Sequence, residues 1–251
     1  MSKYEMCHCL RDRTINDMWR RLMWHCLKNG YSYIIKKGSY EGDIRVQLLF
    51  VSFLIEEPWT RPLAVHVPEH LGFSAPTDEE KIEQYWYEYL MTDKEHETEE
   101  YTYGQYINEK HRGKSQLDRI IELLNISKGK TNQATLTIGD PKVAHLENPP
   151  CLRTIDFKVI PGNPPELQMT VFFRSWDLFV GIPENLGGLQ LLKEYVIENL
   201  KFKVKDGPIT GSSSGLHIYG QYFPMIEELT RKKIKVIKKT EDECEVEISD
   251  K

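Results

Sequence analysis

Hydrophobic residues recur along the chain at helical spacing in some segments and at strand spacing in others. Residues three and four apart are apolar in four segments, which predicts a helix in each. The predicted helices cover residues 15–28, 77–89, 115–124 and 185–199. Thr14 and Asp17 resemble a capping box before the first helix, and Asn29-Gly30 ends it.

Alternating apolar and polar residues predict strands in the remaining segments. The predicted strands lie within residues 31–55, 133–138, 153–160, 166–173 and 217–223. Near the C-terminus, Ile234 and Val236 face Cys244, Val246 and Ile248 across a turn, which predicts a hairpin. Helices that interrupt runs of strands without strict alternation indicate an α+β fold.

Charge and hydropathy exclude several classes of protein. The 251 residues carry 33 Lys and Arg against 38 Asp and Glu, so a generally basic nucleic-acid-binding surface is excluded. The longest apolar run, residues 46–55, is too short to cross a bilayer. The N-terminal residues lack the basic, apolar and small-residue order of a signal peptide. We therefore expect a soluble cytoplasmic protein that binds neither nucleic acid nor membrane.

The five cysteines are odd in number and scattered, which argues against a secreted disulfide framework. Cys7-His8-Cys9 contains metal-binding residue types, but no second pair with metal-ligand spacing accompanies it. Small hydrophobic residues or surface thiols are the favoured interpretation of these cysteines. We expect no metal site.

Cys151 differs from the other cysteines because it follows Pro149 and Pro150, which stiffen the backbone before the thiol. A thiolate is the reactive form of cysteine, and a nearby cation such as Arg174 would lower its pKa. The alternative is a small buried residue beside a strand. On spacing alone, that alternative is the more common one.

Two further segments carry candidate binding residues. Arg174 and Ser175 combine a fixed cation with a hydroxyl, which suits a phosphate, although a surface ion pair is the general alternative. Asp177 lies two residues beyond Ser175 and faces the same side of an extended segment. Asn185 can both donate and accept hydrogen bonds, which suits the edge of a pyrimidine, or it can serve as a helix N-cap.

Together these segments resemble the thymidylate synthase family. The resemblance rests on four motifs in order: Pro150-Cys151, Arg174-Ser175-Trp176-Asp177, Gly181-Ile182-Pro183-Glu184-Asn185 and His217-Ile218-Tyr219. Two looser matches lie upstream, at Glu83-Gln84-Tyr85-Trp86-Tyr87 and at Tyr103-Gly104. The resemblance covers about residues 80–223, and it implies a single α+β domain over residues 1–251, with a large mixed β-sheet flanked by helices.

The resemblance also implies a reaction, the reductive methylation of dUMP to dTMP. Cys151 would add to C6 of the uracil ring, and the one-carbon donor would be 5,10-methylenetetrahydrofolate or methylenetetrahydromethanopterin. Tyr103 would join Cys151 and Arg174 in the catalytic site, and Glu83 would order the water that transfers protons. The implied binding roles are phosphate for Arg174 and Ser175, uracil for Asn185, the sugar hydroxyl for His217 and Tyr219, and the pterin for Asp177, Gly181 and Trp86. A homodimer is also implied.

Several positions depart from the family pattern. Leu152 replaces the usual His after the cysteine, and Phe173 replaces the Gln before Arg-Ser. The arginine pair that the partner subunit normally lends to the phosphate would fall near Asn132 and Gln133, which carry no charge. The family's N-terminal phosphate arginine has no clear match, although Lys36, Lys37 or Arg45 could substitute. The pattern is closer to the short archaeal branch of the family than to the bacterial enzyme. A methanopterin-type one-carbon donor is therefore an alternative to folate.

Two other functions compete with this interpretation. A pyrimidine nucleotide hydroxymethylase shares the fold and the cysteine but quenches the methylene adduct with water. In its deoxycytidylate form an Asp takes the place of the Asn, so Asn185 favours uracil. A catalytically retired nucleotide-binding homologue is the second alternative. Cys151 argues against it, whereas the missing arginines keep it open.

Overall fold

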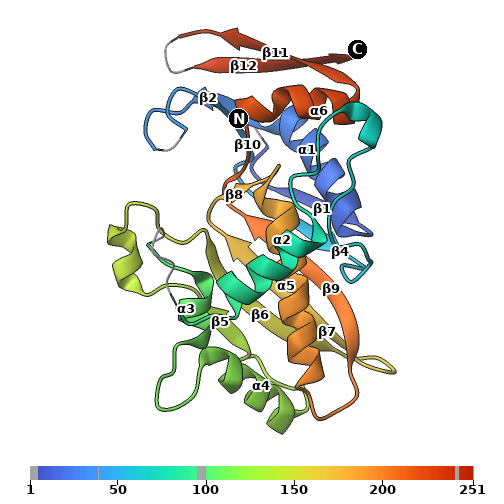
Figure 1. The fold of residues 1–251 in the computed structure, drawn as a ribbon, viewed down its shortest axis with the longest axis vertical. Helices are drawn as coiled ribbons and strands as arrows, with labels where there is room; N and C mark the ends of the chain where they lie inside the picture. The colour runs from blue at the N-terminus through green and yellow to red at the C-terminus, as the bar shows by residue number, and fades with distance from the viewer. Residues whose placement is uncertain (1–4, 39, 95–99, 241–242, 251) are drawn as a thin grey trace.

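The computed structural model describes residues 5–38, 40–94, 100–240 and 243–250. Its main sheet is mixed and has six strands (Figure 1). Their order is β1 (His8–Asp12), β4 (Val51–Ile55), β9 (Lys205–Ser213), β7 (Glu166–Phe173), β6 (Leu152–Ile160) and β5 (Thr135–Thr137). The pairs β1–β4 and β7–β9 are parallel, and the others are antiparallel.

A second sheet continues two strands of the first. Its order is β2 (Tyr31–Ile34), β3 (Ile44–Gln47), β10 (Leu216–Tyr219) and β8 (Trp176–Asp177). The strands β8 and β10 follow β7 and β9 along the chain after short breaks, one at Arg174-Ser175 and one at Ser214-Gly215. The parallel pair β7–β9 therefore ends at the level where the parallel pair β8–β10 begins, and the ends of these four strands meet.

The helices are α1 (Ile15–Asn29), α2 (Glu79–Gln84), α3 (Tyr103–Asn108), α4 (Gln116–Ser127), α5 (Gly181–Glu198) and α6 (Phe223–Thr230). A π-helical turn, η2 (Tyr85–Leu90), continues α2, and short 3₁₀ turns are η1 (Glu69–Leu71), η3 (Pro141–His145) and η4 (Gly220–Tyr222). Figure 1 shows α2 and α5 in front of the main sheet. The inward-facing Leu167, Met169, Val171 and Phe173 of β7 are fully buried and form part of the core.

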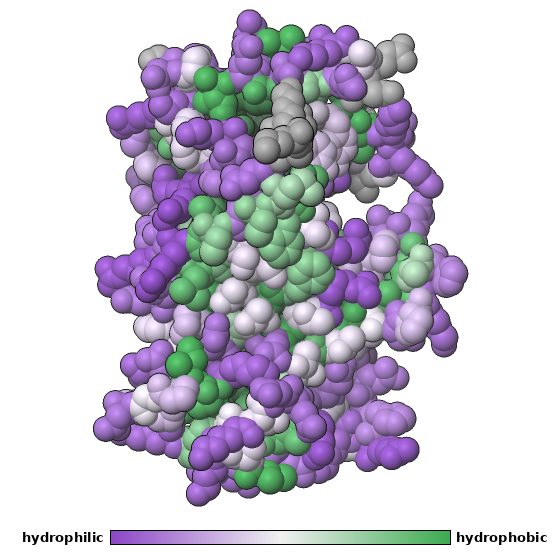
Figure 2. Space-filling view, turned by 180° about the vertical axis from the view of Figure 1, so that it is seen from behind, coloured by the Kyte–Doolittle hydropathy of each residue, from purple (hydrophilic) through white to green (hydrophobic). Residues whose placement is uncertain are grey.

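The alternate residues of β7 point to the opposite face. Gln168, Thr170 and Phe172 are only half-buried there. Figure 2 shows that face of the molecule, with a pale to green area over its middle. In the view of Figure 1 no helix lies behind this part of the sheet. This face is therefore weakly polar and lacks a helical cover among the described residues.

Most predicted elements are confirmed. The helices over residues 15–28 and 115–124 are α1 and α4, and the C-terminal hairpin pairs β11 (Lys232–Lys238) with β12 (Cys244–Asp250). Its register places Ile234 opposite Ile248 and Val236 opposite Val246, as predicted. The tip of the hairpin, at residues 241–242, lies outside the described residues. The predicted α+β fold with a mixed sheet flanked by helices is confirmed.

Two local predictions are wrong in their bounds, and one helix was not predicted. The helix expected to open at Asn185 begins at Gly181, because Asp177 accepts the backbone N–H groups of Phe179 (2.9 Å) and Val180 (3.3 Å) and turns the chain earlier. The extended segment over residues 217–223 ends at Tyr219, and η4 and α6 follow. The helix α3 was not predicted, although Thr102 and Gln105 form a capping box that signals it.

Candidate active site

Cys151 and Arg174 lie side by side because their strands pair directly. Leu152 of β6 is in register with Phe173 of β7, so the residues just outside this pair are neighbours. The backbone N–H of Arg174 donates to the Cys151 carbonyl at 2.8 Å. The guanidinium donates to the carbonyls of Pro150 (3.1 Å) and Pro149 (2.5 Å). The Pro-Pro segment therefore holds the cation beside the thiol.

The electrostatics of the half-buried Cys151 combine two opposing effects. Burial raises the pKa of its thiol, and the nearby Arg174, Arg45 and Arg153 act in the opposite direction. Burial is the larger effect, so the pKa of the Cys151 thiol is raised overall. The arginines thus reduce the shift that burial causes but do not reverse it.

Tyr103, the first residue of α3, reaches the same point. Its hydroxyl accepts the backbone N–H of Leu152 at 3.3 Å, directly after the cysteine. Burial raises the pKa of Tyr103 well above its usual value, and Cys151 adds to the shift, so the hydroxyl keeps its proton at neutral pH. Gly104 lets α3 pack closely against the end of η2, because a Cβ there would lie 2.1 Å from the carbonyl oxygen of Thr92.

A cavity of about 660 Å³ opens in front of Cys151. Its lining includes Arg174, Ser175 and Tyr219, all predicted site residues, and also Lys37 and Arg45. The structure thus brings two of the candidate replacement cations to the predicted phosphate residues. By contrast, Asn132 and Gln133 are exposed just before β5 and do not line this cavity.

Arg45 is held in place by two tyrosines. Its Nη2 donates to the Tyr219 hydroxyl at 2.8 Å and its Nη1 to the Tyr33 hydroxyl at 3.2 Å. Its Nε is buried and has no hydrogen-bond partner among the described residues. A fixed cation with a buried, unpaired Nε–H at a cavity is suited to an anionic or hydroxyl-bearing ligand.

His217 presents an unpaired ring nitrogen. The side chain is 2% exposed, and its Nδ1 lies 2.8 Å from the carbonyl of Gly215. A carbonyl only accepts, so Nδ1 carries the proton and Nε2 is an acceptor. This Nε2 is buried without a partner among the described residues. Burial and the nearby Arg45 lower the pKa of His217 to about 4, so the imidazole is neutral at physiological pH.

Asp177 and Gly181 stand at the start of α5. Asp177 uses Oδ1 for two backbone N–H groups, which leaves Oδ2 for a ligand. Burial raises the pKa of Asp177 to about 6. A Cβ at Gly181 would lie 3.4 Å from the Asp177 Cβ and 3.6 Å from the Asn185 Oδ1, so this glycine keeps the space beside both side chains open. Neither Asp177 nor Asn185 is part of the cavity lining in front of Cys151.

Asn185 lies in the first turns of α5, and its Oδ1 accepts the indole N–H of Trp176 at 3.0 Å. The Trp176 ring stacks on Phe173 with 3.8 Å between centroids. Both aromatic residues occupy variable or substituted positions of the motif, and therefore no sequence signal marked them as functional. Sequence reasoning missed this contact.

The turn η2 adds two more unpaired polar groups. The hydroxyl of Tyr85 and the indole nitrogen of Trp86 are buried without a partner among the described residues. Burial raises the pKa of Tyr85 well above its usual value; Tyr103 and Glu184 add to this shift, and Asn185 opposes it. Tyr85 thus lies near Tyr103, the neighbour of Cys151, and near Asn185. π-Helical turns often occur at functional sites, and this one faces predicted site residues.

Glu83 is a further predicted site residue that lies outside the cavity at Cys151. It is exposed on α2 and does not line the cavity. Glu184, which lies near Tyr85, is half-buried instead, and burial raises its pKa.

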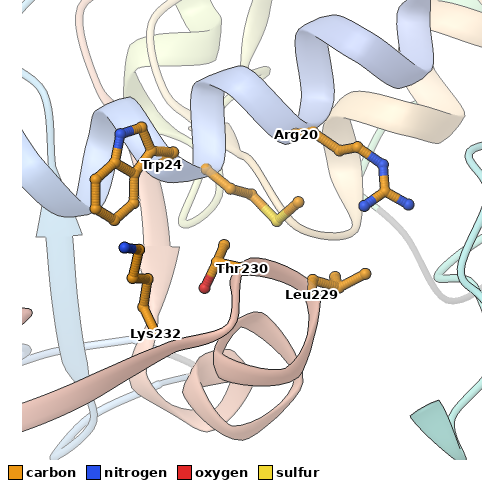
Figure 3. Close-up of a pocket in the computed structure, with 6 residues that line it drawn as sticks. Arg20, Trp24, Leu229, Thr230 and Lys232 are labelled. Carbon is orange, nitrogen blue, oxygen red and sulfur yellow. The ribbon is translucent and has the colours of Figure 1, made fainter. Parts of the chain in front are cut away.

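A smaller cavity of about 230 Å³ lies between α1 and α6 (Figure 3). Arg20 and Trp24 from α1 face Leu229, Thr230 and Lys232 there. The Lys232 ammonium lies 5.4 Å from the centre of the Trp24 ring and also pairs with Asp250. None of its lining residues carries a thiol, a carboxyl group or an imidazole.

The described residues contain no group of three or more His, Cys, Asp or Glu side chains arranged for a metal. In β1 the imidazole of His8 is buried, whereas Cys7 and Cys9 are exposed, so the three side chains of the Cys7-His8-Cys9 segment do not converge. None of the described helices combines the length and the apolar character that a bilayer crossing needs.

Known proteins resemble the chain over most of its length. Residues 74–248 match the family model for thymidylate synthase. A protein of Methanosarcina barkeri named "Putative thymidylate synthase" is 29% identical over 91% of this chain and 97% of its own. One of the same name from Methanothermobacter marburgensis is 33% identical over 86% and 95%. The thermostable thymidylate synthase A of Bacillus subtilis has the same fold, with a TM-score of 0.61, 13% identity and 90% coverage of both chains.

Proposed function

Because the chain belongs to the thymidylate synthase family, we propose that it methylates C5 of dUMP reductively to form dTMP, with a methylene-tetrahydropterin as the donor. The observation that carries this proposal is the position of Cys151. Its thiol lies among three arginines at a cavity that Arg174, Ser175 and Arg45 line. The alternatives share the fold and are distinguished by their products.

Cys151 is the proposed nucleophile. Addition of its thiolate to C6 of uracil makes C5 nucleophilic and divides a difficult carbon–carbon bond formation into easier steps. C5 then attacks the one-carbon unit. Loss of the C5 proton and elimination of the tetrahydropterin leave an exocyclic methylene, hydride transfer from the pterin reduces it to a methyl group, and the Cys151 thiolate leaves C6. Tyr103 supports this chemistry as a protonated hydroxyl beside the cysteine.

The nucleotide would lie across the cavity. Arg174 and Ser175 would bind the phosphate, and Lys37 and Arg45 supply positive charge that Asn132 and Gln133 lack. The Nε2 of His217 accepts, and the neighbouring Tyr219 hydroxyl can donate, so the pair suits a sugar hydroxyl. Asn185 would read the uracil edge.

The pterin site would use residues around the start of α5. Asp177 offers Oδ2 as an acceptor for ring N–H groups, and Gly181 leaves room for a flat ring. The buried indole N–H of Trp86 has no partner among the described residues and would supply a donor. These groups fit a reduced pterin of the folate or the methanopterin type.

Glu83 is proposed to order the water for proton transfer on the strength of its motif. Its exposed position makes the half-buried Glu184 the necessary comparison. Glu83→Gln should lower kcat far more than Glu184→Gln. The reverse order would transfer the role to Glu184.

We also propose a cytoplasmic homodimer. The weakly polar face of the main sheet, with Gln168, Thr170 and Phe172, would pack against the same face of a second copy. Burial of Phe172 would favour this arrangement. Thr170→Arg should shift the sedimentation profile from dimer to monomer, whereas Glu88→Arg, at an exposed site on η2, should not.

The activity is tested by incubating the protein with dUMP and either methylene-tetrahydropterin. Chromatography and mass spectrometry identify the nucleotide product. Formation of dTMP with oxidation of the pterin supports the proposal. Formation of 5-hydroxymethyl-dUMP would indicate the hydroxymethylase, and binding of dUMP without turnover would indicate a retired homologue.

A further inference from the structure

We infer that Trp176 is a specificity-determining residue, because its indole N–H fixes the orientation of the Asn185 amide and thereby sets which pyrimidine the site reads. This inference rests on the proposed function, in which Asn185 faces the base. It adds a residue that the motif leaves variable. Trp176 acts through Asn185 and is therefore a positioning residue.

The contact determines which amide atom faces which way. The indole Nε1 lies 3.0 Å from the Asn185 Oδ1. An indole N–H is only a donor, so the amide atom that faces it must be the acceptor oxygen. The Nδ2 donor then points in the other direction. The amide thus presents a single arrangement of donor and acceptor.

Both partners are held rigidly. Trp176 is 2% exposed, and its ring stacks on Phe173 with an interplanar angle of 11°. Its backbone N–H donates to the Gly215 carbonyl at 3.1 Å, which anchors the start of β8. Asn185 belongs to α5, whose flanking Leu186 is fully buried. Neither the ring nor the helix can turn away without loss of packing.

Rigidity matters here because an asparagine is not selective by itself. In one orientation its amide accepts from N3–H and donates to O4 of uracil. After a half-turn of the amide it donates to N3 and accepts from the amino group of cytosine equally well. A freely rotating Asn185 would therefore read both bases, whereas one held by Trp176 reads only one.

Phe173 explains how the aromatic pair is built into the site. It stands where the family usually has Gln, and it is fully buried against Trp176. Trp176 also packs near Phe53, with 5.8 Å between ring centroids. These contacts place the indole edge toward Asn185. The aromatic pair thus fixes the indole that orients the Asn185 amide.

The test is Trp176→Phe, which keeps an aromatic ring and removes the N–H. Trp19→Phe is the matched control, because its equally buried indole N–H donates to the Leu178 carbonyl at 3.1 Å and to no side chain in the binding site. The affinities for dUMP and dCMP are measured by calorimetry for the wild type and both variants. Thermal melting confirms that each variant is folded.

We expect the wild type to prefer dUMP by roughly 10- to 100-fold, the cost of a mispaired polar edge. In Trp176→Phe the preference should fall to within about threefold, whereas Trp19→Phe should keep the wild-type ratio. If Trp176→Phe does not fold, Trp176 is replaced by 3-benzothienylalanine, which has the same shape with sulfur in place of the N–H.

The outcomes separate the two proposals. An unchanged dUMP preference without the N–H overturns the role of Trp176 and leaves the proposed function intact. A wild type that prefers dCMP, with the preference lost in Trp176→Phe, supports Trp176 as the orienting residue and contradicts the uracil assignment. A wild type that binds neither nucleotide overturns both.

Discussion

Arg174 donates its backbone N–H to the carbonyl of Cys151 at 2.8 Å, while its side chain bonds the carbonyls of the two prolines that precede the cysteine. The cation and the thiol are thereby held together by the pairing of β6 with β7. Their relative position does not depend on a flexible side chain alone. The chemistry proposed for this site begins from that arrangement.

Cys151→Ser should abolish formation of dTMP and leave the affinity for dUMP within about twofold of the wild type. A serine hydroxyl without an activating base is a far weaker nucleophile at neutral pH. Product assays and calorimetry measure the two effects. Cys7→Ser, at an exposed position, is the control and should keep full activity. Wild-type turnover by Cys151→Ser would remove this cysteine from the mechanism.

Arg174→Ala should weaken dUMP binding by about 2 kcal/mol, because a charge-assisted contact to the phosphate is lost. Deoxyuridine, which lacks the phosphate, should lose much less affinity. Arg153→Ala serves as the control, since that arginine also lies near Cys151 but does not line the cavity. Equal losses for nucleotide and nucleoside would contradict the phosphate assignment.

The KM for the pterin should rise as the pH falls through about 6. Burial raises the pKa of Asp177 to about 6, so below that pH the carboxyl gains a proton and accepts ring N–H groups less well. Asp177→Asn should have a high KM that no longer changes with pH in this range. A pH-dependent KM that persists in the variant would place the titrating group elsewhere.

Asn185→Asp should shift the preference from dUMP toward dCMP. A protonated carboxyl can donate to N3 of cytosine while its other oxygen accepts from the amino group, and each mismatch costs about 1–3 kcal/mol. The measurement is kcat/KM on both nucleotides for both proteins. The same preference in both would mean that Asn185 has only a structural role in α5.

His217 should make the fold sensitive to acid. Its pKa is about 4 in the folded protein against 6.5 in the unfolded chain, so the unfolded state binds more protons between these values. The free energy of unfolding should therefore fall as the pH drops from about 6.5 to 4, by up to about 3 kcal/mol. Denaturant titrations should show a smaller loss of stability on acidification for His217→Gln than for the wild type. His66→Gln, which replaces an exposed histidine, should show the same loss as the wild type.

The sequence alone determined the elements that depend on neighbouring residues. The helix α1 follows from apolar residues at helical spacing and from the Thr14 cap, which accepts the Asp17 N–H as predicted. The register of the C-terminal hairpin follows from the alternation around Ile234 and Val236. The motif order likewise selected Cys151 and Arg174 as candidates, and the structure places them side by side.

Only the tertiary structure decided which distant residues meet. Arg45 reaches Tyr219 because β3 pairs with β10, and the orientation of the Asn185 amide depends on an indole nine residues away. The exposed position of Glu83 and the early start of α5 are also results of packing and of hydrogen bonds at Asp177. Local periodicity specifies a segment's type and face, whereas contacts between segments depend on strand pairing and burial, which no single segment contains.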